Sequence, residues 1–526
     1  MKKIVTYDTT LRDGTQGEGV SLSVQDKLKI AHKLDQLGID YVEGGWPGSN
    51  PKDLEFFQMM QDVELKHARL SAFGSTRRPG VAPEEDANLN AFIASGAQTI
   101  TIFGKTWDLH VTDALKVPLE ENLAMIRESV AYLLSKGKEV FYDAEHFFDG
   151  YKANPAYALQ TLQEAQNAGA SVVILCDTNG GTLPGEITEI MEAVKEVITV
   201  PLGIHCHNDS ELAVANTLAA VQAGATQVQG TTNGLGERCG NANLMSVIPN
   251  LQLKMGYDCI GDNIQHLTDA ARYVSEIANL VMPNSQPFVG QSAFAHKGGI
   301  HVSAVLKNPK TYEHMEPESI GNKRRVLVSE LAGAANLKYK VQELGLDFPD
   351  DKSAQQKIIR RVKEMEHAGY QFEGAEGSFE LLLKKEMGHF EPGFELDSFR
   401  VSTEKLGQNK VYSEATVKIR VADQVMHTAA EGKGPVNALD NALRKALTQV
   451  YPDVSQMHLS DYKVRVLDAN EATGAAVRVL LESQDENASW GTIGVSTDII
   501  EASWHALTDS ISYKLMKDKD RDRKSE

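Results

Sequence analysis

The feature that most constrains the fold is an alternation, through the first half of the chain, of short β-branched runs with longer amphipathic stretches. The helix-like stretches include Val24–Leu37, Leu119–Ser135, Pro155–Ala168 and Glu186–Val197. Eight short runs between such stretches are expected to be strands: Lys3–Tyr7, Tyr41–Glu43, Arg69–Phe73, Thr99–Phe103, Glu139–Asp143, Val172–Cys176, Leu202–Cys206 and Gln227–Gly230. Eight strand–helix units in roughly 250 residues predict an α/β fold of the (β/α)8 or TIM-barrel type. An open, doubly wound sheet is the alternative.

Glycines punctuate this alternation at the expected helix ends. Gly38, Gly96, Gly169 and Gly224 each stand between a helix-like stretch and the next strand-like run. Glycine adopts the left-handed conformation of a helix C-cap at little cost, so these positions support the predicted boundaries.

The chain of 526 residues is too long for one ordinary domain. We expect a TIM-barrel catalytic domain over residues 1–275 and helical linker subdomains over 276–390. A C-terminal α+β domain over 391–516 and a disordered, charge-dense tail over 517–526 complete the division.

The C-terminal domain holds an internal near-repeat. Ala415–Val421 leads into Gly432–Leu443, and Ala475–Leu481 leads similarly into Trp490–Trp504. Each copy predicts strands, a glycine turn and a helix with one apolar face. Small domains of this kind commonly bind effectors or form dimers, and a purely structural appendage is the alternative.

Charge and composition exclude several classes of function. The formal net charge of −19 argues against a nucleic-acid partner, because phosphate binding needs a basic surface. No long apolar run indicates a membrane span, and the N-terminus lacks the apolar core of a signal peptide. The four cysteines lack C-x-x-C spacing, which is typical of a cytoplasmic protein without a disulfide framework.

Polar residues gather where the predicted strands end. They are Asp8–Asp13, Glu43, Thr76–Arg78, Glu145–His146, Asp177–Asn179, His205, His207 and Asn233–Asn243. Catalytic residues of TIM barrels lie at this carboxyl edge of the strands, so we expect the active site there.

The strongest chemical signal is the pair His205 and His207. Residues two apart on a strand point to the same side, whereas Cys206 between them would face the surrounding helices. Two imidazoles with a carboxylate suit a divalent metal, and Asp13 on the first loop is the natural third ligand. A structural histidine pair is the alternative for the H-x-H motif alone.

Neighbouring residues suggest how such a metal site would be used. Arg12 beside Asp13 is suited to neutralise an oxyanion or clamp a carboxylate, with a salt bridge as the alternative. Glu145 could accept a proton. Gly234–Asn241 is rich in glycine but lacks the G-K-[ST] ending of a phosphate loop. Its members Glu237, Arg238 and Asn241 are expected to support or extend the metal site.

Three segments together resemble the DRE-TIM metallolyase family: Tyr7–Gly14, Ile204–Asp209 and Gly236–Ala242. The C-terminal repeat resembles the regulatory domain of the 2-isopropylmalate synthase branch, whose members condense acetyl-CoA with 2-keto acids. Within that branch, Glu43–Asn50 and Phe141–Gly150 are most similar to the citramalate synthases, which use pyruvate. The resemblance covers nearly the whole chain.

The resemblance implies roles for individual residues. Asp13, His205, His207 and Asn241 would be the metal ligands, and Arg12 would stabilise the keto oxygen as it becomes an alkoxide. Thr178 would bind the keto-acid carboxylate. His301 would be a catalytic histidine that reaches a neighbouring subunit's active site, with Tyr312 at the same site. Val328–Gly333 departs from the branch's Gly-Lys-His-Ser-Gly-like stretch, so its part in acetyl-CoA binding is in doubt.

The expected reaction joins acetyl-CoA to pyruvate chelated by the metal, with His301 and Glu145 as candidate bases, and then hydrolyses the thioester. The ligand set admits Mg²⁺, Mn²⁺, Co²⁺ or Zn²⁺. The bulky residues Trp46, Phe103 and Tyr142 favour a small keto acid. A homodimer and feedback inhibition by isoleucine are further expectations. The alternatives are a 2-isopropylmalate synthase acting on 2-ketoisovalerate, a C–C lyase or aldolase on the same barrel, and an amino-acid-binding regulatory protein.

Overall fold

The computed structural model describes residues 1–327, 334–343, 351–406, 410–422, 424–467 and 474–525. The chain divides into two compact units, each described by itself below. The first contains Met1–Phe294 and Met315–Arg324, and the second contains Ala295–His314 and Arg325–Glu526.

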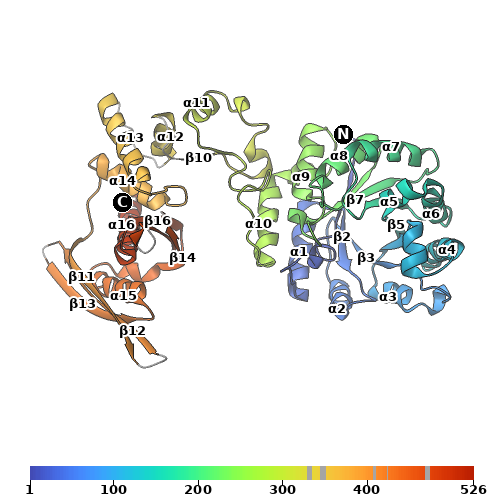
Figure 1. Ribbon diagram of the computed structural model, residues 1–526, viewed down its shortest axis with the longest axis horizontal. Coiled ribbons are helices and arrows are strands. Elements are labelled where there is room, and N and C mark those ends of the chain that lie inside the picture. The colour runs from blue at the N-terminus through green and yellow to red at the C-terminus, as the bar shows by residue number, and fades with distance from the viewer. Residues whose placement is uncertain (328–333, 344–350, 407–409, 423, 468–473, 526) are drawn as a thin grey trace. The chain divides into compact units, whose positions relative to one another are not determined.

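The first unit is built around a closed barrel of eight parallel strands (Figure 1). The strands are β1 Val5–Asp8, β2 Tyr41–Gly45, β3 Arg69–Ser75, β4 Thr99–Lys105, β5 Glu139–Glu145, β6 Val172–Asp177, β7 Leu202–Cys206 and β8 Gln227–Gly230. Strand β1 pairs with β2 on one side and with β8 on the other, where Val5 lies opposite Gln227. The predicted TIM barrel is therefore confirmed, and the open sheet is excluded.

Helices surround the barrel and bury its outer face. They are α1 Val24–Leu37, α2 Pro51–Met60, α3 Ala87–Ser95, α4 Leu119–Ser135, α5 Phe147–Ala153, α6 Pro155–Asn167, α7 Pro184–Lys195, α8 Ala213–Ala223, α9 Leu244–Pro249 and α10 Leu267–Ile277. Helix α1 begins with a capping box between Ser23 and Asp26 and ends at Gly38, whose φ is 86°. Helices α3 and α8 also end at left-handed glycines, Gly96 and Gly224.

Alternation along each strand divides the barrel's side chains between two buried layers. On β5, Tyr142 and Ala144 pack outward into the main core beneath the helices. Phe141, between Val140 and Tyr142, points into the barrel and packs against Tyr7 and Ile174. The next inward position is Asp143, which lines the cavity described below. Because these side chains fill the barrel interior at this level, the cavity described below opens at the carboxyl edge of the strands.

The second unit begins with short elements that follow the barrel. They are β9 Ala295–His296, α11 Gly299–Lys307, β10 Arg325–Val326, α12 Ala334–Glu343, α13 Lys352–His367 and α14 Glu376–Glu386. Strands β9 and β10 are paired in parallel. Leu337 of α12, Ile358 and Val362 of α13 and Phe379 of α14 share one apolar cluster.

The rest of the second unit is two copies of a three-stranded antiparallel sheet followed by a helix (Figure 1). The first copy is β11 Glu395–Leu406, β12 Lys410–Val421, β13 Gln424–Gly432 and α15 Pro435–Leu447. The second is β14 His458–Val466, β15 Val477–Gln484, β16 Ser489–Ser496 and α16 Ile499–Ser525. Alternate residues of β12 pack with α15, and Val479 and Leu481 of β15 pack with Ala502 and Ala506 of α16. The predicted α+β domain with an internal repeat is confirmed.

The C-terminal segment differs from the disorder expected for 517–526. Helix α16 continues through it to Ser525, and Lys517 donates a hydrogen bond of 2.9 Å to Glu380. Lys384 likewise donates to Asp520 at 3.0 Å. The charged side chains of this segment thus form ion pairs with α14. The composition of the segment alone does not reveal these partners. The wider division at residues 275 and 390 stays a prediction.

Within the described residues, every helix is too short or too polar to cross a membrane.

Candidate metal centre

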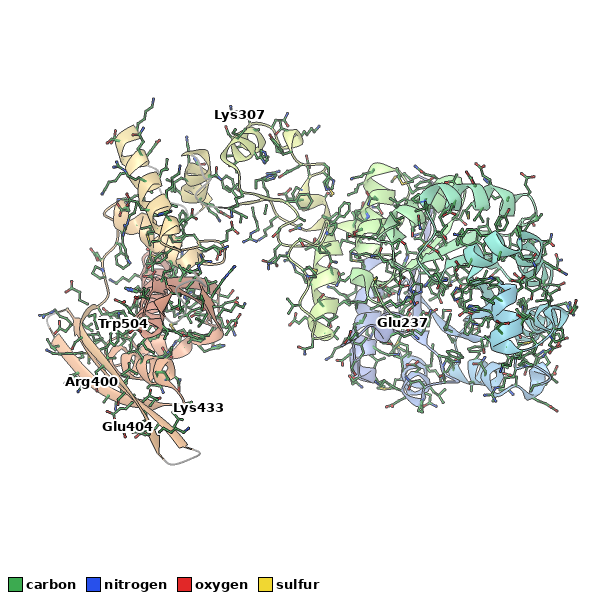
Figure 2. The ribbon with its side chains drawn as sticks, in the orientation of Figure 1. Glu237, Lys307, Arg400, Glu404, Lys433 and Trp504 are labelled. Carbon is green, nitrogen blue, oxygen red and sulfur yellow. The ribbon has the colours of Figure 1, made fainter. Side chains whose placement is uncertain are left out.

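Side chains from most of the strand ends converge on a cavity of about 250 Å³ at the carboxyl edge of the barrel. Glu237, labelled in Figure 2, lies at the rim with its side chain 59% exposed. The remaining lining residues are Arg12, Asp13, Gln16, Trp46, Phe73, Phe103, Asp143, Glu145, Cys176, Thr178, His205, His207 and Arg238.

At the floor of this cavity lie Asp13, His205 and His207, whose candidate ligand atoms are all within 4.8 Å of one another. The Nε2 atoms of His205 and His207 are 3.4 Å apart, and Asp13 Oδ2 lies 3.4 Å and 3.9 Å from them. All three are buried: Asp13 is 2% exposed, His205 is 5% exposed and His207 is 7% exposed. Buried carboxylate and imidazole groups that face each other in this way are suited to enclose a cation.

Asn241, in the glycine-rich segment, lies beside His207. It forms an isolated antiparallel bridge with His207, and its amide nitrogen donates to the carbonyl of Leu235 at 3.1 Å. Among the described residues, the buried atoms Asn241 Oδ1 and Asp13 Oδ1 have no hydrogen-bond partner. Buried acceptors without donors are costly in a folded protein, and a cation held by Asp13, His205 and His207 would satisfy Asp13 Oδ1. The residues therefore fit a divalent metal.

Electrostatics favour a cation at Asp13 and His207, whereas at His205 the carboxylate of Asp13 outweighs burial and raises the pKa of the imidazole. Burial would raise the pKa of Asp13, but the charge of Arg12 and the two imidazoles outweigh burial and hold that pKa well below its usual range. Burial and the neighbouring His205 lower the pKa of His207 to about 4, so its imidazole is neutral near pH 7. An ionised carboxylate and a neutral imidazole are the forms that bind metals.

Arg12 is held rigidly beside the metal ligands. Its Nε donates to Glu43 Oε1 at 2.6 Å, and its guanidinium lies 3.6 Å from the centre of the Phe73 ring. Glu43 is fully buried and accepts a second hydrogen bond of 2.8 Å from Tyr7. The salt bridge that was the alternative for Arg12 is present, and Arg12 also lines the cavity. The ion pair therefore fixes the orientation of the guanidinium and leaves it able to contact a ligand in the cavity.

One wall of the cavity is aromatic. The ring centres of Phe73 and Phe103 are 5.4 Å apart, and Trp46 stands edge-on to both at 6.1 Å and 5.6 Å. The indole of Trp46 is fixed by a hydrogen bond of 2.6 Å to Asn88. Trp46 and Phe103 thus lie where the sequence predicts, but Tyr142 does not. Tyr142 points outward into the helical core, and Asp143 takes the inward position beside it.

Glu145 and Thr178 also line the cavity. Glu145 forms an ion pair with Lys105 at the end of β4. The hydroxyl of Thr178 accepts a hydrogen bond of 2.9 Å from the backbone N–H of His146. This contact leaves the hydroxyl proton of Thr178 able to donate to a ligand. His146 itself packs edge-on to His110 at 4.3 Å and lies outside the cavity lining.

At the rim, Arg238 forms hydrogen bonds that connect several loops. Its guanidinium donates to both carboxylate oxygens of Asp209, at 2.8 Å and 3.0 Å, and to the carbonyl of Thr178 at 2.8 Å. These bonds join the loops after β6 and β7 to the Gly234–Asn241 segment. The segment expected to extend the metal site is thereby tied to it.

His301 and Tyr312 belong to the second unit, where they contact each other. Their rings are stacked with centres 4.2 Å apart. Close by in sequence, His296 Nε2 lies 2.9 Å from Glu313 Oε1, in a largely buried pair. The two residues that the sequence pairs at one active site are thus brought together. Val328–Gly333, the departure from the family pattern, lies outside the described residues.

Sequence reasoning missed three residues at this centre. Phe73 stacks on Arg12, Asp143 lines the cavity, and Gln229 Oε1 accepts a hydrogen bond of 3.0 Å from His205 Nδ1. Phe73 and Asp143 are the last residues of their predicted strands, and Gln229 is one residue before the end of its strand. Their place near strand ends is visible in the sequence, but their contacts with Arg12 and His205 are not.

The chain matches three family models along its length. A model described as HMGL-like matches residues 3–279, one described as homocitrate synthase post-HMGL domain-like matches 288–369, and one described as LeuA allosteric (dimerisation) domain matches 373–515.

Relatives align over nearly the whole chain. A Geobacter sulfurreducens protein named (R)-citramalate synthase is 56% identical over 519 residues, covering 98% of both chains. One of the same name from Aquifex aeolicus is 56% identical over 522 residues, covering 99% of both. A Methanopyrus kandleri protein named probable 2-isopropylmalate synthase is 33% identical over 512 residues, covering 97% of this chain and 98% of that one.

Proposed function

The chain belongs to the HMGL-like family and, within it, to the (R)-citramalate synthases, and from this premise we propose how its residues perform the reaction. The reaction is the condensation of acetyl-CoA with pyruvate and water to give (R)-citramalate and CoA. The observation that supports it most directly is the buried group of Asp13, His205 and His207 with Arg12 fixed beside it at the barrel mouth.

In this proposal Asp13, His205, His207 and Asn241 hold a divalent metal. Bound there, the cation would act as a Lewis acid that polarises the keto group of pyruvate. Mg²⁺, Mn²⁺, Co²⁺ and Zn²⁺ all accept such a mixture of oxygen and imidazole ligands, and the proposal does not depend on which one is bound.

In this proposal Arg12 stabilises the negative charge that develops on the keto oxygen. Its guanidinium is fixed by Glu43 and Phe73, so little reorganisation is needed when that charge appears. Thr178 binds the carboxylate of pyruvate in this proposal. Its hydroxyl oxygen accepts from the N–H of His146, so its hydroxyl proton can donate to that carboxylate. The aromatic wall of Trp46, Phe73 and Phe103 would then enclose the methyl group.

His301, with Tyr312 stacked on it, is assigned the removal of a methyl proton from acetyl-CoA, with Glu145 as an auxiliary group. The electron pair of that C–H bond forms the new C–C bond to the keto carbon. Arg12 faces the resulting alkoxide, which takes up the proton that His301 removed. Water then adds to the thioester carbonyl, and the thiol of CoA leaves with a proton.

Partners follow from the same assignment. The LeuA allosteric (dimerisation) domain over residues 373–515 supports a homodimer. In such a dimer His301 would serve the site of the neighbouring subunit. Isoleucine is proposed as the feedback inhibitor, and its test is a titration of the initial rate with isoleucine against leucine as the control.

A panel of 2-keto acids tests the proposed substrate. We expect CoA release to be faster with pyruvate than with 2-ketoisovalerate by at least about tenfold in kcat/KM, since two extra methyl groups meet the aromatic wall. Preference for 2-ketoisovalerate would instead identify a 2-isopropylmalate synthase. Cleavage of a hydroxyacyl-CoA without net condensation would identify a lyase on the same barrel.

A further inference from the structure

Behind His205 lies a chain of buried polar side chains that the proposed reaction does not use directly. His205 Nδ1 is 3.0 Å from Gln229 Oε1, and Gln229 Nε2 is 3.2 Å from Asp143 Oδ1. Gln229 is fully buried and Asp143 is 4% exposed. The chain runs across the barrel interior from β7 through β8 to β5.

The chemistry of an amide sets the direction of this chain. Gln229 Nε2 lies 3.2 Å from Asp143 Oδ1, and because an amide NH₂ group only donates, that oxygen is the acceptor. The other end, which faces His205, is then the carbonyl oxygen, and a carbonyl only accepts. Nδ1 of His205 must therefore carry the proton.

A neutral imidazole carries one proton, so its second nitrogen is left with a lone pair. In His205 that nitrogen is Nε2, which lies 3.4 Å from both Asp13 Oδ2 and His207 Nε2. In the neutral form that a metal ligand requires, the lone pair thus points at the centre where the other candidate ligands meet. The opposite tautomer would direct a proton into that centre.

We propose that Gln229 is a positioning residue that holds His205 in the Nδ1–H tautomer, and that Asp143 fixes the orientation of the Gln229 amide. Hydrogen-bond partners behind metal-binding histidines commonly act in this way. The inference deepens the proposed function, since it rests on the metal site assigned there.

The test measures metal affinity rather than turnover. Mn²⁺ is titrated by calorimetry into protein stripped with a chelator, for wild type and for Gln229→Leu, which keeps the size but removes both hydrogen bonds. We expect about a 10- to 100-fold weaker Mn²⁺ affinity in Gln229→Leu. Gln229→Glu restores an acceptor for Nδ1–H, so its affinity should return to within about tenfold of wild type.

Gln227 supplies the matched control. It lies two residues earlier on the same strand, is 2% exposed and also points into the barrel against Gly203. Within the described part of the chain, neither atom of its amide has a hydrogen-bond partner. Gln227→Leu should therefore leave Mn²⁺ affinity unchanged. Equal losses in Gln227→Leu and Gln229→Leu would show a packing effect and overturn the proposal.

Asp143→Ala tests the second half of the chain. Without its acceptor the Gln229 amide is free to rotate, so we expect a loss of Mn²⁺ affinity smaller than that of Gln229→Leu. An unchanged affinity would remove Asp143 from the proposal. Wild-type affinity in Gln229→Leu would overturn the role of Gln229 while leaving the metal site intact, whereas failure of the wild type to bind any divalent cation would instead overturn the site itself.

Discussion

The orientation of the Arg12 guanidinium is fixed by neighbouring side chains before any substrate binds. Its ion pair with the buried Glu43 and its stacking on Phe73 restrict it to one orientation. A flexible arginine would lose conformational entropy on meeting a substrate, and this one has already lost it on folding. The same logic applies to His205, whose ring is fixed by Gln229.

Replacement of His205 by alanine should remove metal binding and turnover together. Loss of the cation forfeits several kcal/mol of transition-state stabilisation, so CoA release should fall by about 10³-fold or more. The Cys206→Ala variant is the control, because Cys206 on the same strand packs outward in the core. Calorimetry with Mn²⁺ and a thiol assay check both variants. Full activity after removal of the metal from wild type would contradict the site.

Phe103→Ala should change which keto acid is accepted. The variant opens the aromatic wall while leaving Phe73 stacked on Arg12. We expect the ratio of kcat/KM for 2-ketoisovalerate over pyruvate to rise by about tenfold or more, the usual value of one or two methyl groups in a pocket. Tyr142→Phe should leave this ratio unchanged, because Tyr142 lies in the outer core. An unchanged ratio in Phe103→Ala would place the acceptor elsewhere.

At the scale of elements, the close packing of β8 against the glycine-rich segment positions Asn241. A Cβ atom on Gly230 would lie 2.3 Å from the carbonyl oxygen of Ala242, which is part of the backbone. Ala242 also donates its N–H to Cys206, so this segment has little room to move away. Gly230 thus permits the approach that brings Asn241 opposite His207.

Gly230→Ala should therefore both destabilise the barrel and weaken metal binding. Overpacking of this kind costs about 1–3 kcal/mol of unfolding free energy. Gly185→Ala is the control, because Gly185 lies in the first turn of α7 with no atom within 4 Å of its Cβ position. Alanine there should be neutral or stabilising. Chemical denaturation with and without Mn²⁺ measures both effects, and equal stabilities would contradict the prediction.

The sequence was sufficient to predict strand ends but not every inward-facing residue. Parallel barrel strands are buried on both faces, so their polarity does not alternate in a readable way. On β5, Val140, Phe141 and Tyr142 are all buried, and the wrong member was assigned to the cavity. His205 and His207 escaped this difficulty because two polar residues flank an apolar one. Gln229 and Phe73 could not be assigned, since their roles depend on contacts with β7 and with Arg12.

For the whole molecule, the assignment of His301 to a neighbouring subunit's site has a direct test. His301→Ala and His205→Ala chains, each inactive alone, should regain activity when unfolded together and refolded. In a symmetric dimer, half of the pairs are mixed and each mixed pair has one intact site, so about a quarter of wild-type activity is expected. Mass measurement by light scattering confirms the dimer. Restored activity well below that level would indicate that His301 acts within its own chain.

Closure of the barrel between β1 and β8 has a consequence for how the protein is made. Val5 pairs with Gln227, and the proposed ligands extend from Asp13 to Asn241. During synthesis the edge of β1 that pairs with β8 stays unpaired until β8 has left the ribosome. A nascent chain shorter than this has no complete site in which to retain a cation. Metal loading is therefore a late event in biosynthesis, and it would also act as a check that barrel assembly is complete.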